Sequence, residues 1–236
     1  MRDKKIFRFK HFAIHHHQAT MKVGTDGVLL GAWVNVTEAR RILDVGTGTG
    51  LIALMLAQRT PTQVQIDGIE ISESDVQQAR QNIRLSPWPE KVQVHHGSLQ
   101  KFQAEPYDLI VSNPPYFNKS YPPPELLRTQ ARHSITLSAQ DLLEHSKRLI
   151  RETGTLGVIL PENEGRHLLS LAEQTGWYCT RECIFQSRKE KPVERLLLEF
   201  QRFPSSTKKE SLVLYSTGEN WSNAYRALTR DFYLKS

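Results

Sequence analysis

The four residues 113–116, Asn-Pro-Pro-Tyr, combine groups that can hold a planar nitrogen base. They follow the apolar run 107–112, which is typical of a buried strand, so Asn113 is expected where that strand ends. The Asn113 side-chain oxygen and the Pro114 carbonyl are two hydrogen-bond acceptors, and Pro114 restricts Asn113 to extended geometry. Tyr116 offers an aromatic face for stacking. A chain of this length contains this tetrapeptide by chance roughly once in a thousand cases, so we favour a binding site over a plain turn.

Two fixed acceptors suit one kind of chemistry. The lone pair of an exocyclic amine is delocalised into its ring, so a catalyst must hold both N–H groups and aim the nitrogen at an electrophile. Orientation and charge stabilisation then supply the rate, without an obligatory strong base. The pattern therefore indicates group transfer to an amine or amide nitrogen.

The segment 43–51, Leu-Asp-Val-Gly-Thr-Gly-Thr-Gly-Leu, lies between a predicted strand and a predicted helix. Glycines there let backbone N–H groups approach a ligand at a helix N-terminus. A dinucleotide-binding fingerprint requires a third glycine at the position of Leu51, so that fingerprint fails by one residue. The pattern of an acid, Asp44, followed by Gly46, Gly48 and Gly50 favours a different nucleoside ligand.

Glu70 ends the second predicted strand of this unit. A carboxylate at that position can accept hydrogen bonds from both ribose hydroxyls. The glycine loop and Glu70 together predict a nucleoside site at the carboxyl edge of a sheet.

Strand-like and helix-like segments alternate from residue 41 onward, which is typical of a parallel sheet covered on both faces. A short helix over 25–35, with Thr25 or Asp26 near its start, is expected before this core, and Ser72 is expected to cap the third helix of the chain. The expected strands are 41–46, 64–71, 91–96, 107–113 and 155–161, with an antiparallel pair at 177–185 and 193–200, and the expected helices are 50–59, 72–85, 137–150 and 164–176.

Length and composition fit one α/β domain, 1–236, with a basic N-terminal segment (1–40) and a short C-terminal extension (204–236) that begins with the linker 203–210. No run of residues has the length and apolarity of a membrane helix, and the N-terminus lacks a secretory signal, so we expect a cytoplasmic protein that does not contact membranes. Cys179 and Cys183 do not have metal or disulfide spacing. His15–His17 could bind a metal, but no cysteine or carboxylate cluster accompanies them, and we expect no metal site.

The chain carries 31 lysines and arginines against 25 acidic residues, a net charge of +6. Up to residue 22 there are six basic residues and one acid, which indicates a polyanionic partner or a solvated N-terminus. Candidate contacts to the phosphates of such a partner, in the N-terminal segment and on later basic residues, include Lys22, Arg132, His133 and Lys191. Phe117 either lines the base pocket or packs.

The motif acid-x-Gly-x-Gly-x-Gly resembles the first motif of class I S-adenosylmethionine-dependent methyltransferases. That resemblance implies a Rossmann-like, mostly parallel sheet of seven strands with an antiparallel terminal hairpin, helices on both faces, and S-adenosylmethionine as cofactor. It implies a set of cofactor-binding residues at Asp44, Gly46, Thr47, Gly48, Gly50, Glu70, Ile71, Ser98 and Asn113. The family often has an acid where this chain has Ser98.

Asn-Pro-Pro-Tyr resembles the motif of methyltransferases that act on adenine N6, on guanine N2 or on glutamine amides. Across nearly the whole chain, the segments 7–33, 131–143 and 190–200 and the close at 230–235 resemble the bacterial tRNA1(Val) (adenine-N6)-methyltransferase family. The resemblance implies methylation of the adenine immediately 3′ to the anticodon of a valine tRNA, with Asn113, Pro114 and Tyr116 as catalytic residues.

Several alternatives stay open. A protein glutamine methyltransferase or an rRNA guanine-N2 methyltransferase would share the tetrapeptide, and a non-catalytic RNA-binding module would share the fold. An unpaired loop adenine needs less unstacking than one in duplex DNA, which favours tRNA. We expect a monomer, and we expect the proline-rich segment 117–134 to act as a flap over the target base.

Overall fold

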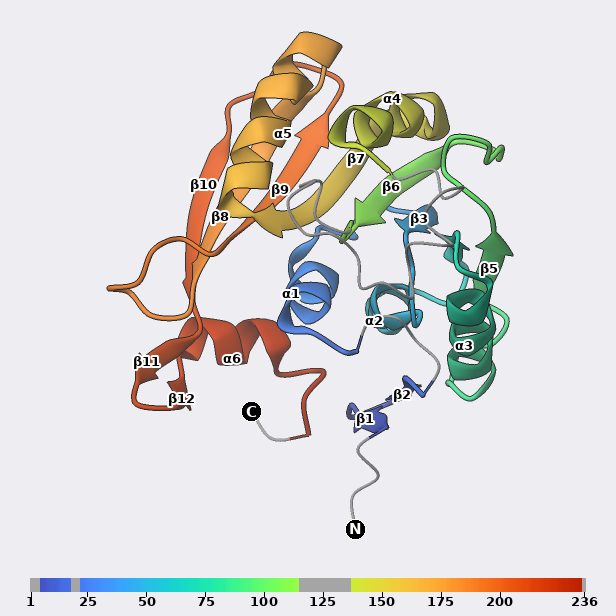
Figure 1. Ribbon diagram of the computed structural model, residues 1–236, viewed down its shortest axis with the longest axis horizontal. Coiled ribbons are helices and arrows are strands. Elements are labelled where there is room, and N and C mark those ends of the chain that lie inside the picture. Colours follow the sequence, from blue (N-terminus) through green and yellow to red (C-terminus); the bar gives the residue numbers. More distant parts are fainter. Residues whose placement is uncertain (1–4, 18–21, 115–136, 235–236) are drawn as a thin grey trace, which may run out of the picture.

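The computed structural model describes residues 5–17, 22–114 and 137–234. Its centre is a sheet of eight strands in the order β10-β8-β9-β7-β6-β3-β4-β5, with helices packed on both faces (Figure 1). The strands of this sheet are β3 (Arg41–Val45), β4 (Gln65–Glu70), β5 (Val92–His96), β6 (Tyr107–Ser112), β7 (Ile150–Pro161), β8 (Tyr178–Gln186), β9 (Arg195–Gln201) and β10 (Lys208–Val213). The helices are α1 (Thr25–Trp33), α2 (Leu51–Arg59), α3 (Glu73–Arg84), α4 (Ala139–Leu149), α5 (Glu162–Thr175) and α6 (Asn223–Thr229).

Strand directions follow the α/β pattern that the sequence predicts. Strand β9 pairs antiparallel with both β7 and β8, whereas the other neighbouring pairs of the sheet are parallel. The predicted fold class is therefore confirmed, including the antiparallel β8–β9 hairpin. The predicted number of seven strands is wrong by one, because β10 adds an eighth strand beside β8.

Helix ends agree with their sequence signals. Ser72 precedes α3, and its hydroxyl oxygen accepts a hydrogen bond from the Asp75 backbone N–H. Ser138 and Asp141 form a reciprocal capping box at the start of α4. Helix α5 ends at Gly176, whose left-handed backbone (φ 74°) suits glycine.

The sheet separates two hydrophobic cores. Alternate residues of β3 point to opposite faces, so Ile42 belongs to one core and Leu43 to the other. Helices α1, α2 and α3 cover the face of Ile42, while α4 and α5 cover the face of Leu43. This two-sided burial explains why the central strands are almost continuously apolar.

The chain termini contain structure that the sequence analysis did not predict. Residues 5–17 include a small antiparallel hairpin of β1 (Ile6–Arg8) and β2 (Ala13–His15). The segment 203–210 was expected to be a linker, but β10 begins at Lys208. Within the segment 204–236, residues 208–213 are therefore part of the main sheet. A second small hairpin, β11 (Tyr215–Thr217) with β12 (Asn220–Trp221), precedes α6.

Strand β10 and helix α1 are joined by a charged cluster around Arg181 on β8. The Arg181 guanidinium donates to a Glu210 carboxylate oxygen (2.9 Å) and to the Trp33 carbonyl oxygen (3.1 Å), and it lies 3.6 Å from Glu199. It also stacks 4.0 Å from the centre of the Trp33 ring. In the part of the chain that is described, no helix is long and apolar enough to cross a membrane.

Candidate active site at the carboxyl edge of the sheet

The glycine loop leaves β3 and is bound to the neighbouring strand β4. The backbone N–H groups of Gly46 and Thr47 both donate to the Ile69 carbonyl oxygen, at 2.9 and 3.1 Å. Gly46, Gly48 and Gly50 have positive φ values (71°, 53° and 80°), which glycine adopts without steric cost. A Cβ at Gly46 would meet no atom within 4 Å. Open space therefore borders the loop at the point where its backbone is expected to contact a ligand.

Asp44 lies fully buried beneath this loop. One carboxylate oxygen accepts hydrogen bonds from the Thr47 hydroxyl (2.7 Å) and from the Ala53 backbone N–H in the first turn of α2 (3.2 Å). The other oxygen is buried and has no hydrogen-bond partner among the described residues. Desolvation by burial raises the pKa of Asp44 to about 7, although both hydrogen bonds oppose this shift.

Glu70 ties the glycine loop to the turn that begins α3. One carboxylate oxygen accepts a hydrogen bond from the Gly48 N–H (3.0 Å), and the other accepts from Ile71 (2.7 Å) and Ser72 (2.9 Å). Burial raises the pKa of Glu70, while these backbone N–H groups act to lower it. Ile71 follows with 45% of its surface exposed, a large apolar side chain at the rim of the loop.

Asn113 leaves the sheet beside the glycine loop. The register of β3 and β6 pairs Val45 with Ser112, so the next residues along each strand, Gly46 and Asn113, leave the sheet side by side. Asn113 is half-buried and Pro114 is buried. The structure therefore brings the acceptor side chain of Asn113 to the same edge as the predicted nucleoside site, as the strand order requires.

The start of α1 lies at this edge as well. Gly27 packs against Leu51, the first residue of α2, so closely that a Cβ would come within 2.9 Å of the Leu51 side chain. Asp26 forms a half-buried ion pair with Arg195 (2.8 Å), and Arg195 is opposite Pro161, where β7 ends. The start of α1 thus contacts both the helix that follows the glycine loop and the strand residue opposite the end of β7.

The remaining predicted residues lie as follows. Ser98 comes just after β5, where the Gly97 N–H donates to the Glu70 carbonyl oxygen (2.9 Å). Its hydroxyl oxygen is buried without a hydrogen-bond partner in the described ranges. Lys22 is exposed two residues before the N-cap of α1, and Lys191 is exposed in the β8–β9 connection. Five predictions lie outside the described residues, namely Tyr116, Phe117, Arg132, His133 and the flap 117–134.

Two residues at this edge were missed by the sequence analysis. The buried Ser112 hydroxyl donates to the Val45 carbonyl oxygen (2.9 Å), which ties the strand of Asn113 to the strand of the glycine loop. Asn82 on α3 is also fully buried, and its side-chain amide donates to the Thr49 carbonyl oxygen of the loop (2.9 Å). A polar residue within an apolar strand was the available signal for Ser112, but nothing local to Asn82 identifies its partner.

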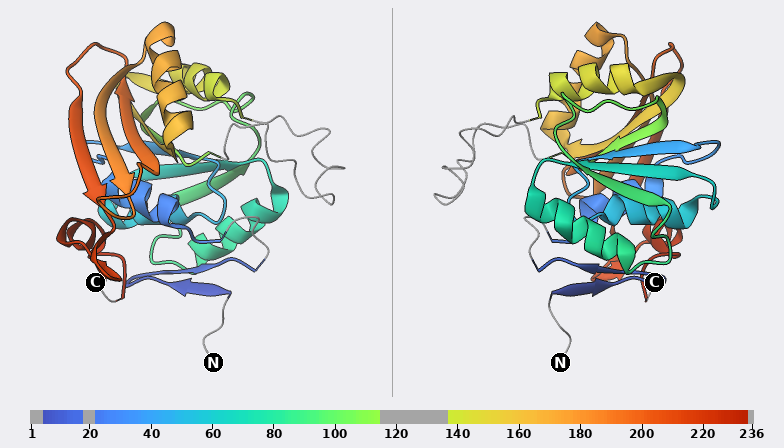
Figure 2. Two further views of the ribbon diagram at one scale, coloured as in Figure 1. Left: turned by 60° about the vertical axis from the view of Figure 1, so that its left-hand side comes forward. Right: turned by 90° about the vertical axis from the view of Figure 1, so that its right-hand side faces the viewer.

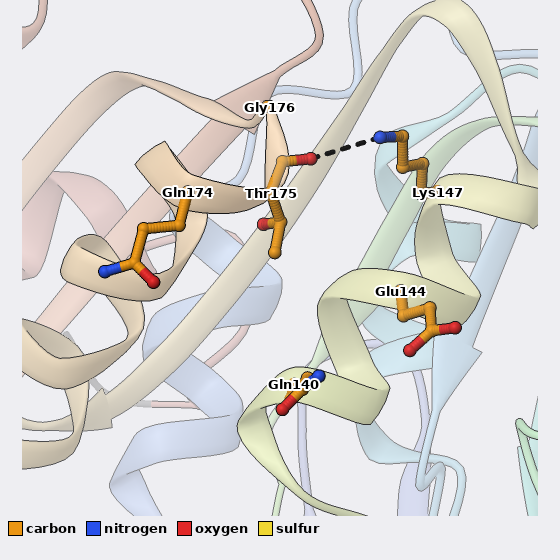
Figure 3. A pocket seen from close by; sticks show the side chains of 6 residues that line it. All are labelled: Gln140, Glu144, Lys147, Gln174, Thr175 and Gly176. Atoms are coloured by element: carbon orange, nitrogen blue, oxygen red, sulfur yellow. Dashed lines mark hydrogen bonds between the residues drawn. The ribbon is translucent and has the colours of Figure 1, made fainter.

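A shallow pocket elsewhere does not take part in this arrangement. It lies between α4 and α5, with Gln140, Glu144 and Lys147 on one side and Gln174, Thr175 and Gly176 on the other (Figure 3). The Lys147 ammonium donates to the Thr175 carbonyl oxygen (3.2 Å), which satisfies the end of α5. None of the predicted site residues lines it. Across the described ranges, no group of three or more His, Cys, Asp or Glu residues has a metal-binding arrangement.

The fold and the edge geometry define a class I methyltransferase. A family model described as "Methyltransferase small domain" matches residues 18–176. A predicted O-methyltransferase from Agrobacterium tumefaciens has a similar structure, with a TM-score of 0.65 at 17% identity, covering 88% of this chain and 96% of that one.

Curated relatives narrow this class. The tRNA1(Val) (adenine(37)-N6)-methyltransferase of Tolumonas auensis is 45% identical over 229 residues, which is 97% of each chain. The protein of the same name from Histophilus somni strain 2336 is 41% identical and covers 99% of each chain. The chain belongs to the family of tRNA1(Val) (adenine(37)-N6)-methyltransferases.

Proposed function

We propose that this protein transfers a methyl group from S-adenosylmethionine to the exocyclic N6 of an adenine in the anticodon loop of tRNA, adenine 37 of a valine tRNA in its named relatives. The observation that carries the proposal is the position of Asn113 next to the glycine loop, fixed by the pairing of Val45 with Ser112. This register supports the proposal, because acceptors on Asn113 and Pro114 would then lie beside the expected position of the methyl donor. A tRNA substrate also implies a cytoplasmic enzyme.

The residues at the edge fit the cofactor. The Asp44 carboxylate, buried beneath the loop, can favour the ammonium of the methionine moiety through its charge, and the remaining lone pairs of Glu70 can accept from the ribose hydroxyls. The exposed side chain of Ile71 can cover one face of the adenine, and the Ser98 hydroxyl can bond its edge. Gly46, Thr47, Gly48 and Gly50 form the backbone cradle, and open space at Gly46 leaves room for the ligand.

Bound S-adenosylmethionine supplies an electrophilic methyl group on a positively charged sulfur. The chain then has to orient the amine. The Asn113 side-chain oxygen and the Pro114 carbonyl accept the two N6 hydrogens, which increases the electron density on nitrogen and directs its lone pair. As the amine becomes cationic, these same acceptors stabilise its charge, and its extra proton leaves to water after transfer. We assign Tyr116 to stacking on the base.

Phosphate contacts are assigned to four basic residues of the chain. Lys22 and Lys191 are exposed and can contact phosphates of the RNA, and Arg132 and His133 are proposed to do the same. Phe117 is proposed as a further wall of the base pocket. We also propose that the protein is a monomer and that it needs no metal ion.

The function is tested with labelled S-adenosylmethionine and total tRNA from a strain lacking the corresponding gene. The expected product is N6-methyladenosine next to the anticodon of one valine tRNA, located by nuclease mapping and mass spectrometry. Label in guanosine, in ribosomal RNA or in protein glutamine would assign the enzyme to another branch of amino-methyltransferases. No transfer to any of these, with S-adenosylmethionine failing to raise Tm, would contradict the proposal.

The role of Asn113 is tested with Asn113→Ala. Loss of one aligned acceptor is expected to lower kcat by roughly 100- to 1,000-fold, while Kd for tRNA changes less than about threefold. Asn220→Ala, an exposed asparagine of β12, is the control and is expected to retain wild-type turnover. A kcat for Asn113→Ala near that of the control would exclude the assigned mechanism.

A further inference from the structure

The N-terminal hairpin has two chemically distinct sides. Its apolar side chains pack onto the body of the protein, with Phe9, Phe12 and Ile14 at most 6% exposed. The rings of Phe9 and Phe12 stack at 4.6 Å, and Phe12 meets Trp88 edge-on at 6.0 Å. This packing gives a hairpin with three-residue strands the tertiary support that it needs.

The solvent side of the hairpin is basic throughout. In the range 5–17 the exposed residues are Lys5, Arg8, Lys10, His11 and His17, and this range contains no aspartate or glutamate. A solvated surface with no partner usually carries charges of both signs. A surface of one sign, held on an ordered scaffold, points to a polyanion, and long flexible cations over aromatic packing fit a nucleic-acid backbone.

The hairpin is directly connected to the cofactor loop. The backbone of His15, at the end of β2, exchanges two hydrogen bonds with the Asn82 side chain: its N–H donates to the amide oxygen (2.9 Å), and its carbonyl oxygen accepts from the amide nitrogen (2.9 Å). The same amide nitrogen donates to the Thr49 carbonyl oxygen in the glycine loop (2.9 Å). Asn82 is fully buried and so is its bond to Thr49, whereas the two bonds to the His15 backbone are part-buried.

We propose that the β1–β2 hairpin is an RNA-backbone-binding surface and that Asn82 is a positioning residue that couples this surface to the cofactor loop. This rests on the proposed function, since tRNA is the polyanion that the site requires. Figures 1 and 2 show the hairpin on the outer side of α2 and α3.

Coupling follows from the energetics of the hairpin. Basic side chains crowded on one small element repel one another, and RNA phosphates remove that repulsion and so stabilise the hairpin in its packed position. An ordered β2 holds Asn82, and Asn82 then fixes Thr49 between two glycines with positive φ. A loop that is already ordered loses less entropy when the cofactor binds, so each ligand is expected to tighten binding of the other.

The basic surface is tested by fluorescence anisotropy with an unmodified anticodon stem-loop of valine tRNA. Arg8→Glu combined with His11→Glu is expected to raise the RNA Kd at least tenfold and to reduce the slope of log Kd against log salt. Lys209→Glu, an exposed cation on β10 at the opposite edge of the sheet from α3, is the control and is expected to change Kd less than about twofold. Equal effects of the two charge reversals would contradict the proposal.

Coupling is tested with S-adenosylhomocysteine, which binds without turnover. For the wild type, RNA Kd is expected to fall about fivefold or more when this ligand is saturating. Asn82→Ala is expected to bring the ratio of the RNA Kd without the ligand to the RNA Kd with it close to one. Arg8→Glu with His11→Glu instead weakens RNA binding both with and without the ligand. A merely destabilising Asn82 variant would lower Tm and keep the ratio, and that result would overturn the coupling.

The two hypotheses fail differently. If wild-type protein methylates tRNA and the hairpin variant has an unchanged KM for tRNA, the hairpin inference is wrong while the proposed function stands. If wild-type protein methylates no tRNA, the function itself fails. Preferential binding of the hairpin face to vesicles of anionic phospholipid, with no loss of tRNA affinity in the charge reversal, would assign the surface to a membrane and overturn the inference.

Discussion

Asp44 has two carboxylate oxygens in different surroundings. One oxygen supports the glycine loop through Thr47 and the first turn of α2 through Ala53, and the other has no partner among the described residues. Burial raises the pKa of this carboxyl to about 7. A cationic group of a ligand bound above the loop would favour the ionised form of Asp44, so ligand binding and deprotonation should be linked.

This linkage predicts proton release. Below pH 7 the affinity for S-adenosylhomocysteine should rise with pH, by up to about tenfold per pH unit, because the ligand requires ionised Asp44. Calorimetry at pH 6.5 in two buffers of different ionisation enthalpy should detect the released proton. Asp44→Asn should bind weakly and lose most of this pH dependence. Equal proton release by wild type and variant would assign the proton to another group.

The raised pKa of Asp44 also makes the stability of the ligand-free protein depend on pH. Because the folded-state pKa is raised above 3.8, the contribution of protonated Asp44 is present below about pH 4 and is lost as pH rises through about 7. Between pH 5 and 8 the Tm of the wild type should therefore fall relative to that of Asp44→Asn. Parallel Tm curves over this range would contradict the assigned pKa.

Residues differ in how far sequence reveals them. Asp44 and Glu70 were predicted because each lies at or next to the carboxyl end of a strand, at a spacing that one βαβ unit fixes locally. Ser112 and Asn82 were missed because their partners, Val45 and Thr49, are 67 and 33 residues away in sequence. A buried hydroxyl or amide is informative only when the strand or loop carrying its partner is in place.

At the scale of elements, the unpredicted strand β10 shows what the alternation of apolar and polar residues does not reveal. Its sequence, 208–213, is mostly charged or exposed, and only Leu212 is buried, so it has no alternating signal. Its pairing depends instead on Glu210, which meets Arg181 and the Trp33 ring nitrogen. Burial alone would raise the pKa of Glu210, but hydrogen bonds from Arg181, Lys208 and Trp33 outweigh it and hold the pKa at about 2.

Removal of the guanidinium should therefore be costly. Arg181→Ala leaves Glu199 and Glu210 without their shared cation, and we expect a loss of about 3–5 kcal/mol in the free energy of unfolding, measured by urea denaturation. Arg151→Ala removes a more exposed pair with Asp108 and should cost no more than ~1 kcal/mol. Equal losses in the two variants would show that the Arg181 cluster does not hold β10 and α1 together.

At the scale of the whole molecule, the two ends of the described chain pack against each other. The Lys10 backbone N–H donates to the Phe232 carbonyl oxygen (2.8 Å), and the Tyr233 ring lies 6.0 Å from Phe9 and 5.0 Å from Trp221. The hairpin that we assign to RNA is thus supported from one side by α3 and from the other by the C-terminal residues. Sequence patterns could not reveal this contact, because each partner is short and lies near an opposite end of the chain.

This support makes the C-terminal residues a determinant of hairpin order. Tyr233→Ala removes ring contacts to Phe9 and Trp221, and we expect a loss of about 3 kcal/mol in stability. Hydrogen exchange of the amides in residues 6–15 should become at least about tenfold faster, while β3 and β6 keep their protection at denaturant concentrations well below the unfolding transition. Leu234→Ala, a neighbouring side chain that is 57% exposed, should change neither quantity. Unchanged exchange in the hairpin of Tyr233→Ala would mean that α3 alone holds the hairpin, and the C-terminal residues would then have no influence on RNA binding through it.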